Sequence, residues 1–254
     1  MRSRFVLKGP LFISSISIAV AYCFNPGAFG QTAETSNLWT WTDDASHHAA
    51  VVQVSLDGSH GTGVVVRVEK TRPKNDGYVA YVLTAYHVVE ADKDRHIIEI
   101  RYRDGTIAEK AKMLEFDDRN DIALIETWAP KTTVAAKRAT RPATDKTFLE
   151  FAGLGGGADL NDSLRHFSSR ATQPTNENII YADATLLPGD SGGPIFNNRG
   201  ELVGIISGGW FWWDGGATSA KGHPILSTWP ARASNVDAIK GVMPRITEVN
   251  VASR

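Results

Sequence analysis

Short stretches rich in β-branched and aromatic residues follow one another from Val51 to Ser207. They read VVQVSL, GVVVRVE, YVAYVLT, HIIEIRY, TIAEKAKMLEF, DIALIE, TFLEFAG, NIIYADATL and ELVGIIS. Turn-forming sequences such as DGSHG, RPKNDG, RDG, DDRN and NNRG separate them, and RDG and NNRG are typical of tight hairpins. Strands at this spacing, with hardly any helical periodicity between them, predict an all-β barrel or sandwich.

One helix is expected, near the C-terminal end. Ser234 is suited to cap the run NVDAIKGVM, in which Val236, Ile239 and Met243 fall at helical spacing. Earlier in the chain, residues 129–146 are rich in Thr, Ala and Lys and contain few large apolar residues. This composition fits a segment that crosses between two halves of a barrel structure. The run GLGGGADLNDS has the composition of a flexible loop.

Residues 1–30 have the pattern of a secretory signal peptide. Three basic residues among the first eight precede the apolar run LFISSISIAVAYCF, which is too short for a comfortable membrane span. Small residues before Gln31 suit signal peptidase, so we expect cleavage near Gly30; a retained N-terminal anchor is the alternative. Residues 31–46 would then be a lead-in segment. We expect a secreted or periplasmic protein, with no stable membrane insertion after cleavage.

Composition narrows the classes of partner and of chemistry. The chain of 254 residues has a formal net charge of −1 and no basic excess, so nucleic acid binding is not expected. The only cysteine, Cys23, lies in the apolar run and would leave with the signal peptide. The mature chain is expected to have no disulfide, metal thiolate or nucleophilic thiol. Its core alone must therefore stabilise it.

The segment LLPGDSGGPIF places Ser191 between an aspartate and two glycines, a sequence typical of a backbone that bends tightly or approaches another group closely. A serine hydroxyl is a poor nucleophile and needs a base, which a histidine oriented by a carboxylate can supply. Two candidates stand upstream: His87 follows an apolar strand in YVLTAYHVVE, and Asp121 opens one in DDRNDIALIE. Either residue alone is more often structural. Their joint appearance, in the order His87, Asp121, Ser191, favours a catalytic role.

These segments resemble a known family. LTAYHVV, NDIALI and GDSGGPIF, in that order, resemble the three signature segments of trypsin-like (chymotrypsin-fold) serine proteases. The resemblance runs from about Val51 to the terminal helix. It implies an all-β fold of two antiparallel six-stranded β-barrels with a short C-terminal helix. The protease domain would span 47–254, with the first barrel at about 47–130, the second at about 140–230 and the helix at about 234–244.

The same resemblance implies the roles of the site residues. His87 would act as general base and then acid, Asp121 would orient it, and Ser191 would be the nucleophile. The backbone N–H groups of Gly189 and Ser191 would form the oxyanion hole. The implied reaction is hydrolysis of peptide bonds in a protein or peptide substrate through an acyl-enzyme, with no cofactor.

The primary specificity pocket of the family corresponds to four positions here. Thr185, six residues before the nucleophile, would lie at the base of the pocket. Ser207, Gly208 and Gly209 would form its wall and the strand that pairs with the substrate backbone. Because Thr185 is uncharged, the resemblance implies an uncharged P1 residue, medium apolar or aromatic, rather than Lys or Arg.

The lack of disulfides makes the chain more similar to bacterial than to animal members of the family. The spacing of the three catalytic segments resembles that of the bacterial periplasmic high-temperature-requirement proteases. In animal members a freed N-terminus pairs with the aspartate that precedes the nucleophile. Asp190 occupies that position, but no matching activation sequence precedes VVQVSL. Asp190 pairs either with an internal group, for instance an arginine, or with the mature N-terminal segment.

Two other functions compete with an active protease. The aromatic loop 210–213, of sequence WFWW, can pack within the barrel, contact substrate or bind another ligand. A protease-like protein that binds through this loop without cleaving is therefore an alternative. GDSGG also fits the nucleophile elbow of α/β-hydrolases, with Asp214 and His223 in the chain order of that fold. That elbow needs a helix after the serine, where Pro194 and a β-rich run stand instead.

No metal site is expected, because the histidines outside the catalytic segments show no ligand spacing with carboxylates or thiols. These histidines are His47, His48, His60, His96, His166 and His223. A structural or surface role is expected for each of them.

Overall fold

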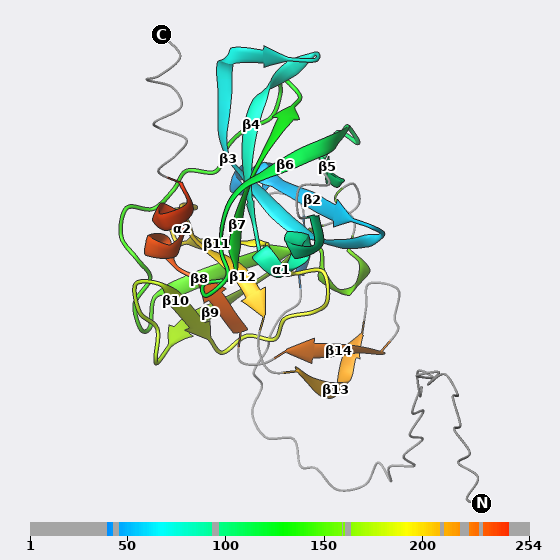
Figure 1. The fold of residues 1–254 in the computed structure, drawn as a ribbon. Helices are drawn as coiled ribbons and strands as arrows, with labels where there is room; N and C mark the ends of the chain where they lie inside the picture. Colours follow the sequence, from blue (N-terminus) through cyan, green and yellow to red (C-terminus); the bar gives the residue numbers. More distant parts are fainter. Residues whose placement is uncertain are drawn as a thin grey trace, which may run out of the picture. The chain divides into compact units, whose positions relative to one another are not determined.

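The computed structural model describes residues 40–42, 46–92, 97–158, 160, 164–208, 211–218, 224–228 and 231–243 (Figure 1). For 40–42, 211–218 and 224–228 only the backbone is described. All of these residues belong to one compact unit, Asn37–Arg254. The expected signal peptide at 1–30 lies outside the described residues, as do His96, Gly209, Trp210 and His223.

Six antiparallel strands close the first barrel, in the order β2-β3-β4-β7-β6-β5. They are β2 (Val51–Leu56), β3 (Ser59–Lys74), β4 (Gly77–Thr84), β5 (Ile98–Arg101), β6 (Ile107–Asp117) and β7 (Ile122–Ala129). The first six apolar runs of the sequence correspond to these six strands. Residues 130–146 then cross to the second barrel without forming a helix or a strand longer than the single bridge of Arg138 to Leu202.

The second barrel also closes with six strands, in the order β8-β9-β10-β15-β12-β11, because β8 pairs with β9. They are β8 (Phe148–Gly153), β9 (Leu164–Thr172), β10 (Ile179–Ala182), β11 (Pro194–Asn197), β12 (Leu202–Gly208) and β15 (Ala231–Ser234). A short strand β1 (Thr40–Thr42) extends the sheet beside β9, and β13 (Phe211–Thr218) pairs with β14 (Pro224–Thr228) in a separate sheet. The predicted fold of two six-stranded antiparallel barrels is confirmed.

Three apolar cores hold this unit together. One fills the first barrel and includes Val54, Val82 and Ile100. A second fills the other barrel and includes Phe151 and Ile180. The third lies between the barrels, since it joins apolar side chains of both and of the C-terminal helix: Val51, Val64, Leu83, Leu124, Leu154, Phe196, Leu202, Ile205, Ile239, Val242 and Met243 are among its members.

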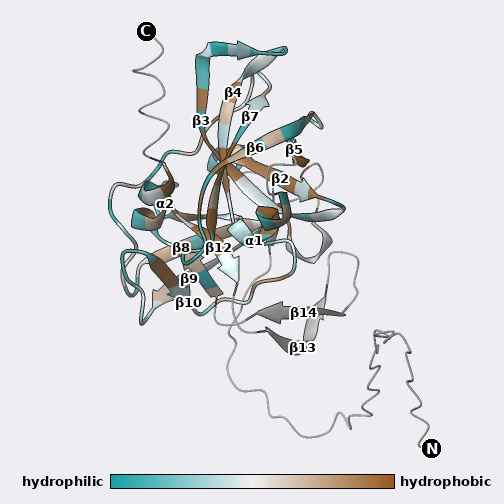
Figure 2. Ribbon diagram, viewed as in Figure 1, coloured by the Kyte–Doolittle hydropathy of each residue, from teal (hydrophilic) through white to brown (hydrophobic). Residues whose placement is uncertain are grey.

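Burial along the strands follows from these cores. The four residues of β5 alternate between buried and exposed, as a strand with one face in water does, whereas all but the last residue of β12 are buried. Figure 2 shows hydrophilic residues at the far end of the β3–β4 hairpin, where the last residues of β3 are largely exposed. That hairpin end therefore projects beyond the core.

The helical segments are short. They are η1 (Ser46–Ala50), α1 (Tyr86–Val89), η2 (Glu90–Asp92), η3 (Gly155–Gly157) and α2 (Val236–Val242). The prediction that Ser234 caps the last helix is wrong: Ser234 is the final residue of β15, and the side chain of Asn235 accepts from the N–H of Val236. No helix in the described part of the chain is long and apolar enough to cross a membrane.

Candidate active site

His87 and Asp121 meet at one end of the first barrel. Thr84 pairs with Ala123 across β4 and β7, so α1, which follows β4, lies beside the residues that precede β7. His87 Nδ1 lies 2.7 Å from Asp121 Oδ2, and the backbone N–H of His87 donates to Asp121 Oδ1 at 2.9 Å. Two contacts from one residue fix the carboxylate, and the contact with Nδ1 in turn orients the imidazole.

Asp121 also receives a hydrogen bond from the second barrel. The hydroxyl of Ser207, on β12, donates to Asp121 Oδ2 at 2.5 Å. Burial by itself would raise the pKa of Asp121, but the bonds from His87 and Ser207, together with the charge of the His87 ring, hold the pKa below its usual value. The carboxylate is therefore ionised at neutral pH.

Ser191 lies in the loop between β10 and β11. Ser207 of β12, which donates to Asp121, also contacts Ser191 and so connects it to the pair of His87 and Asp121. Its hydroxyl donates to the carbonyl oxygen of Ser207 at 3.3 Å. Within the described residues no hydrogen bond joins Ser191 to His87. Arg232 of β15 donates to the Ser207 hydroxyl at 2.9 Å and to the carbonyl of Arg119 at 2.9 Å, so it fixes Ser207 between the barrels.

The backbone N–H groups of the loop fall into two sets. Those of Asp190, Gly192 and Gly193 donate to the carbonyls of Leu187, Ile206 and Asp190 at 2.8–2.9 Å. Those of Gly189 and Ser191 donate to no acceptor among the described residues. The two amides expected to form the oxyanion hole are thus the two that the fold leaves without an internal acceptor.

Thr62, on β3 of the first barrel, holds this loop. Its N–H donates to the Ser191 carbonyl at 2.8 Å, and its hydroxyl donates to the Gly189 carbonyl at 2.7 Å. The same hydroxyl accepts from the N–H of Leu154 at 2.9 Å. The carbonyl of Thr62 in turn accepts from the hydroxyl of Thr84 at 2.7 Å. Sequence analysis did not identify Thr62.

The glycines of GDSGG are required by close approaches. Gly192 has φ +84°, and a Cβ there would lie 2.0 Å from the Thr62 carbonyl oxygen. A Cβ on Gly193 would lie 2.2 Å from the Ala152 carbonyl oxygen. These distances are far inside van der Waals contact, so any side chain would push the serine loop out of place. Pro194 begins β11, as expected.

Asp190 pairs with an internal arginine. Arg165, on β9, donates through Nη1 to Asp190 Oδ2, and neither side chain reaches solvent. Burial lowers the pKa of Arg165 to about 10, so the guanidinium is still cationic at neutral pH. The Asp190 carboxylate also accepts from the N–H groups of Gly155 and Leu187 at 2.9 and 2.8 Å. Of the two alternatives left open by the sequence, the structure shows the internal one.

The expected specificity positions lie near Arg165 and β12. Thr185 is buried, and its carbonyl accepts from Arg165 Nη2 at 3.0 Å. Ser207 is buried and Gly208, the last residue of β12, is partly exposed. Of the expected aromatic loop, Phe211, Trp212 and Trp213 belong to β13, and their side chains are not among those described.

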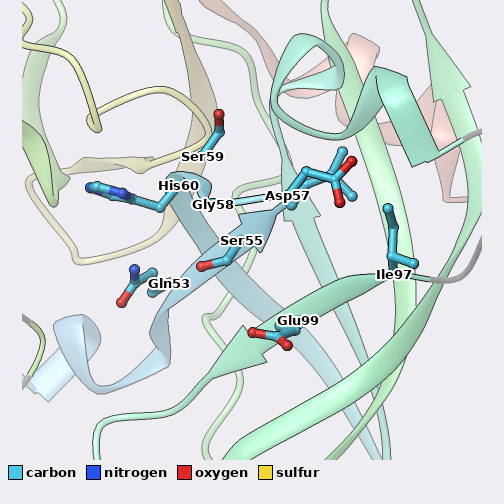
Figure 3. A pocket seen from close by; sticks show the side chains of 9 residues that line it. Gln53, Ser55, Asp57, Gly58, Ser59, His60, Ile97 and Glu99 are labelled. Atoms are coloured by element: carbon cyan, nitrogen blue, oxygen red, sulfur yellow. The ribbon is translucent and has the colours of Figure 1, made fainter.

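A surface hollow of about 430 Å³ lies over the β2–β3 hairpin (Figure 3). Its lining residues are Gln53, Ser55, Leu56, Asp57, Gly58, Ser59, His60, Ile97 and Glu99. His60 precedes Gly61, which packs so closely on the serine loop that a Cβ there would lie 2.8 Å from the Ser191 carbonyl oxygen. The hollow therefore borders the strand segment that packs on the loop of Ser191.

The sequence matches the family described as "Trypsin-like peptidase domain" over residues 61–205. The periplasmic serine endoprotease DegP of Escherichia coli K12 is 33% identical over 150 residues, which are 57% of this chain and 29% of that protein. The serine protease Do-like HtrA of Lactococcus lactis is 24% identical over 204 residues, which are 76% of this chain and 47% of that protein. The chain spans less than half the length of these relatives.

Solved structures share the fold. A Mycobacterium tuberculosis protease in an inactive form is 18% identical, with a TM-score of 0.56 over 79% of this chain and 90% of that one. An HtrA-type protease with a tripeptide is 20% identical, with a TM-score of 0.54 over 78% of this chain and 60% of that one. The family match covers more than half of the chain and includes His87, Asp121 and Ser191. The chain therefore belongs to the family of trypsin-like serine peptidases.

Proposed function

We propose that the protein is an exported serine endopeptidase that uses His87, Asp121 and Ser191 as its catalytic triad. The observation that carries the proposal is a continuous set of hydrogen bonds through Ser207. Its hydroxyl contacts Asp121, which contacts His87, and its carbonyl accepts from Ser191. Ser207 thereby holds the carboxylate of one barrel and the nucleophile of the other in a single site.

The proposed reaction begins with rotation of the Ser191 side chain from the Ser207 carbonyl toward the imidazole. Catalytic hydrogen bonds are often long or misdirected before substrate binds. As Oγ attacks the scissile carbonyl, its proton passes to His87 Nε2, and ionised Asp121 stabilises the imidazolium. The N–H groups of Gly189 and Ser191 stabilise the oxyanion. His87 then protonates the leaving amine, and water hydrolyses the acyl-enzyme.

We further propose that activity needs no pairing of a newly cleaved N-terminus with Asp190. The position that such an N-terminus would take is occupied by Arg165, which is buried and bonded to the carboxylate. A full chain and a chain cleaved near Gly30 are expected to have equal kcat against a peptide substrate. A large rise in kcat on cleavage would contradict this part of the proposal.

The proposed P1 preference is for an uncharged, medium apolar or aromatic residue. Thr185 carries no charge, and the guanidinium near it, Arg165, is already paired with Asp190. Digestion of a peptide library tests the preference. Cleavage dominated by Lys or Arg at P1 would overturn it.

Export rests on the pattern of residues 1–30 and on the periplasmic name of the Escherichia coli relative. Expression of the full chain in a bacterium, followed by intact-mass measurement of the extracytoplasmic fraction, tests it. A mass that begins near Gln31 is expected. A full-length chain confined to the cytoplasm would contradict export.

A fluorophosphonate probe separates an active enzyme from a protein that binds without cleaving. Labelling of the folded chain that disappears in Ser191→Ala is expected. The Ser169→Ala variant is the matched control, because Ser169 lies on β9, where its hydroxyl donates to the Asp183 carbonyl. A folded chain that takes no label would support the binding protein instead.

A further inference from the structure

The N-terminal segment of the described unit carries two histidines onto the second barrel. His47 and His48 lie in η1, and both contact Glu150 of β8, about a hundred positions away in the chain. His47 Nε2 lies 3.1 Å from Glu150 Oε2, and His48 Nε2 lies 2.8 Å from Oε1. A third histidine, His166 of β9, places Nδ1 3.6 Å from the same Oε1.

His48 is the least satisfied side chain of this cluster. It has no solvent exposure, and neither ring nitrogen has a hydrogen-bond partner of acceptable geometry among the described residues. Glu150 Oε1 is close to Nε2 but does not lie along the direction that a hydrogen bond requires. A buried imidazole whose ring nitrogens form no well-directed hydrogen bond costs free energy, so the position needs an explanation beyond packing against Phe196.

The geometry points to a binding site for a divalent first-row transition ion, Zn²⁺ in particular, formed by His47, His48 and Glu150. One ligand atom from each of these residues lies within 4.8 Å of the other two. Two nitrogen or oxygen ligands about 2.1 Å from a tetrahedral ion lie roughly 3.4 Å apart. The contacts of 3.1 and 2.8 Å run to the two different oxygens of Glu150 and are a little shorter than this value, so the imidazoles and the carboxylate would move apart to admit an ion between them.

The type of ligand favours Zn²⁺ over the hard cations. Two imidazoles and one carboxylate are a common set for Zn²⁺, whereas Mg²⁺ and Ca²⁺ require oxygen ligands in larger number. His166 contacts the carboxylate from the neighbouring strand, so it is placed to hold Glu150 in position or to complete the coordination. The remaining position would otherwise be taken by water.

An ion at this site would tie the start of the described unit to the second barrel. Its ligands join η1, which leads into β2 of the first barrel, to β8 of the second. His166 also directly follows Arg165, the partner of Asp190, on β9. Binding of the ion is therefore expected to stabilise the fold. The site would lie one residue along β9 from Arg165, which supports the serine loop through Asp190.

Zn²⁺ titration of the untagged full chain tests the site, with His87→Ala in every protein so that the triad imidazole cannot bind the ion. One equivalent of Zn²⁺ is expected by calorimetry. At a hundredfold excess over Kd, the thermal midpoint should rise by roughly 5 to 10 °C. Mg²⁺ should produce no comparable rise.

Two variants assign the ligands. His47→Gln and Glu150→Gln change side chains that are about one-fifth exposed, so both should fold, and each is expected to weaken Zn²⁺ binding at least tenfold. His60→Gln, on the β2–β3 hairpin away from this cluster, is the control and should bind as before. The site is refuted if Zn²⁺ leaves the thermal midpoint unchanged, or if both variants bind like the control. In that case the cluster only positions Glu150 among the neighbouring histidines.

Discussion

At the scale of single residues, Thr62 connects the first barrel to the serine loop through two hydrogen bonds, and its hydroxyl accepts a third from the N–H of Leu154. Replacing it with valine keeps the shape but leaves the Gly189 carbonyl and the Leu154 N–H without their partner. The unfolding free energy should fall by about 2 kcal/mol or more. Because the Gly189 carbonyl, next to the proposed oxyanion-hole N–H, is then no longer held by the first barrel, kcat should fall at least tenfold while KM changes less.

The control for this prediction is Thr62→Ser, which keeps the hydroxyl. Urea unfolding and steady-state kinetics of the two variants measure both effects. If the serine variant loses as much activity as the valine variant, the hydroxyl is not what positions the loop.

The buried pair of Arg165, on β9, and Asp190 supports the same loop from within the second barrel. Arg165→Met leaves a buried carboxylate without its cation, which should cost about 3–5 kcal/mol of unfolding free energy. Adding Asp190→Asn removes the unpaired charge and should restore part of this loss. Chemical denaturation of the single and double variants measures the coupling. If the double variant loses as much unfolding free energy as the two single variants together, the pair does not act as a unit.

At the scale of elements, the β11–β12 turn is stabilised by charge. Hydrogen bonds from Asn197, Lys137 and Arg199 lower the pKa of Glu201 to about 2. A folded-state pKa below the usual value stabilises the fold above pH 4.5, and the contribution is lost as pH falls toward 2. The thermal midpoint of the wild type should therefore drop more steeply over this range than that of Glu201→Gln. Parallel slopes for the two proteins would contradict the prediction.

Strands were predictable where their burial in a barrel core requires runs of β-branched residues. β9 was not, since LRHFSSRAT mixes charged and polar residues with few apolar ones. Its polarity has structural causes: Arg165 pairs with Asp190, and His166 contacts Glu150. The helix cap was predicted one residue too early, at Ser234. Tertiary contacts are again the cause, because the pairing of β15 with β10 and β12 extends to Ser234.

The glycine run after β8 shows the limit of composition. It has the residues of a flexible loop, yet Gly155 and Gly156 are buried. A Cβ on Gly155 would lie 2.3 Å from Asp190 Oδ1. Gly155 is therefore needed for close approach to a carboxylate 35 positions away, and no local pattern reveals such a contact.

At the scale of the whole described unit, the core between the barrels determines whether the site exists at all. Ile239 of α2 is buried in this core with Leu124 and Leu202. Ile239→Ala should cost about 2–5 kcal/mol. Both barrels should still unfold in one transition, because they share this core. Calorimetry that resolves two separate transitions in the wild type would contradict a shared core.

The sequence singled out the three segments that carry His87, Asp121 and Ser191 but could not show how they meet. His87 and Asp121 come from one barrel and Ser191 from the other, so their relation depends on contacts made by Thr62, Ser207 and other residues outside the signature segments. The Ser207 hydroxyl was assigned to the pocket wall alone. Its bond to Asp121 follows from the packing of β12 against the first barrel, which single-strand patterns do not encode.

The central claim is that His87, Asp121 and Ser191 act as one unit, and the kcat values of single and combined variants test it most directly. Ser191→Ala and His87→Ala should each lower kcat by roughly a millionfold, and the triple variant that also carries Asp121→Ala should be no slower than either. Substantial activity in Ser191→Ala, or losses that multiply in the triple variant, would contradict the account.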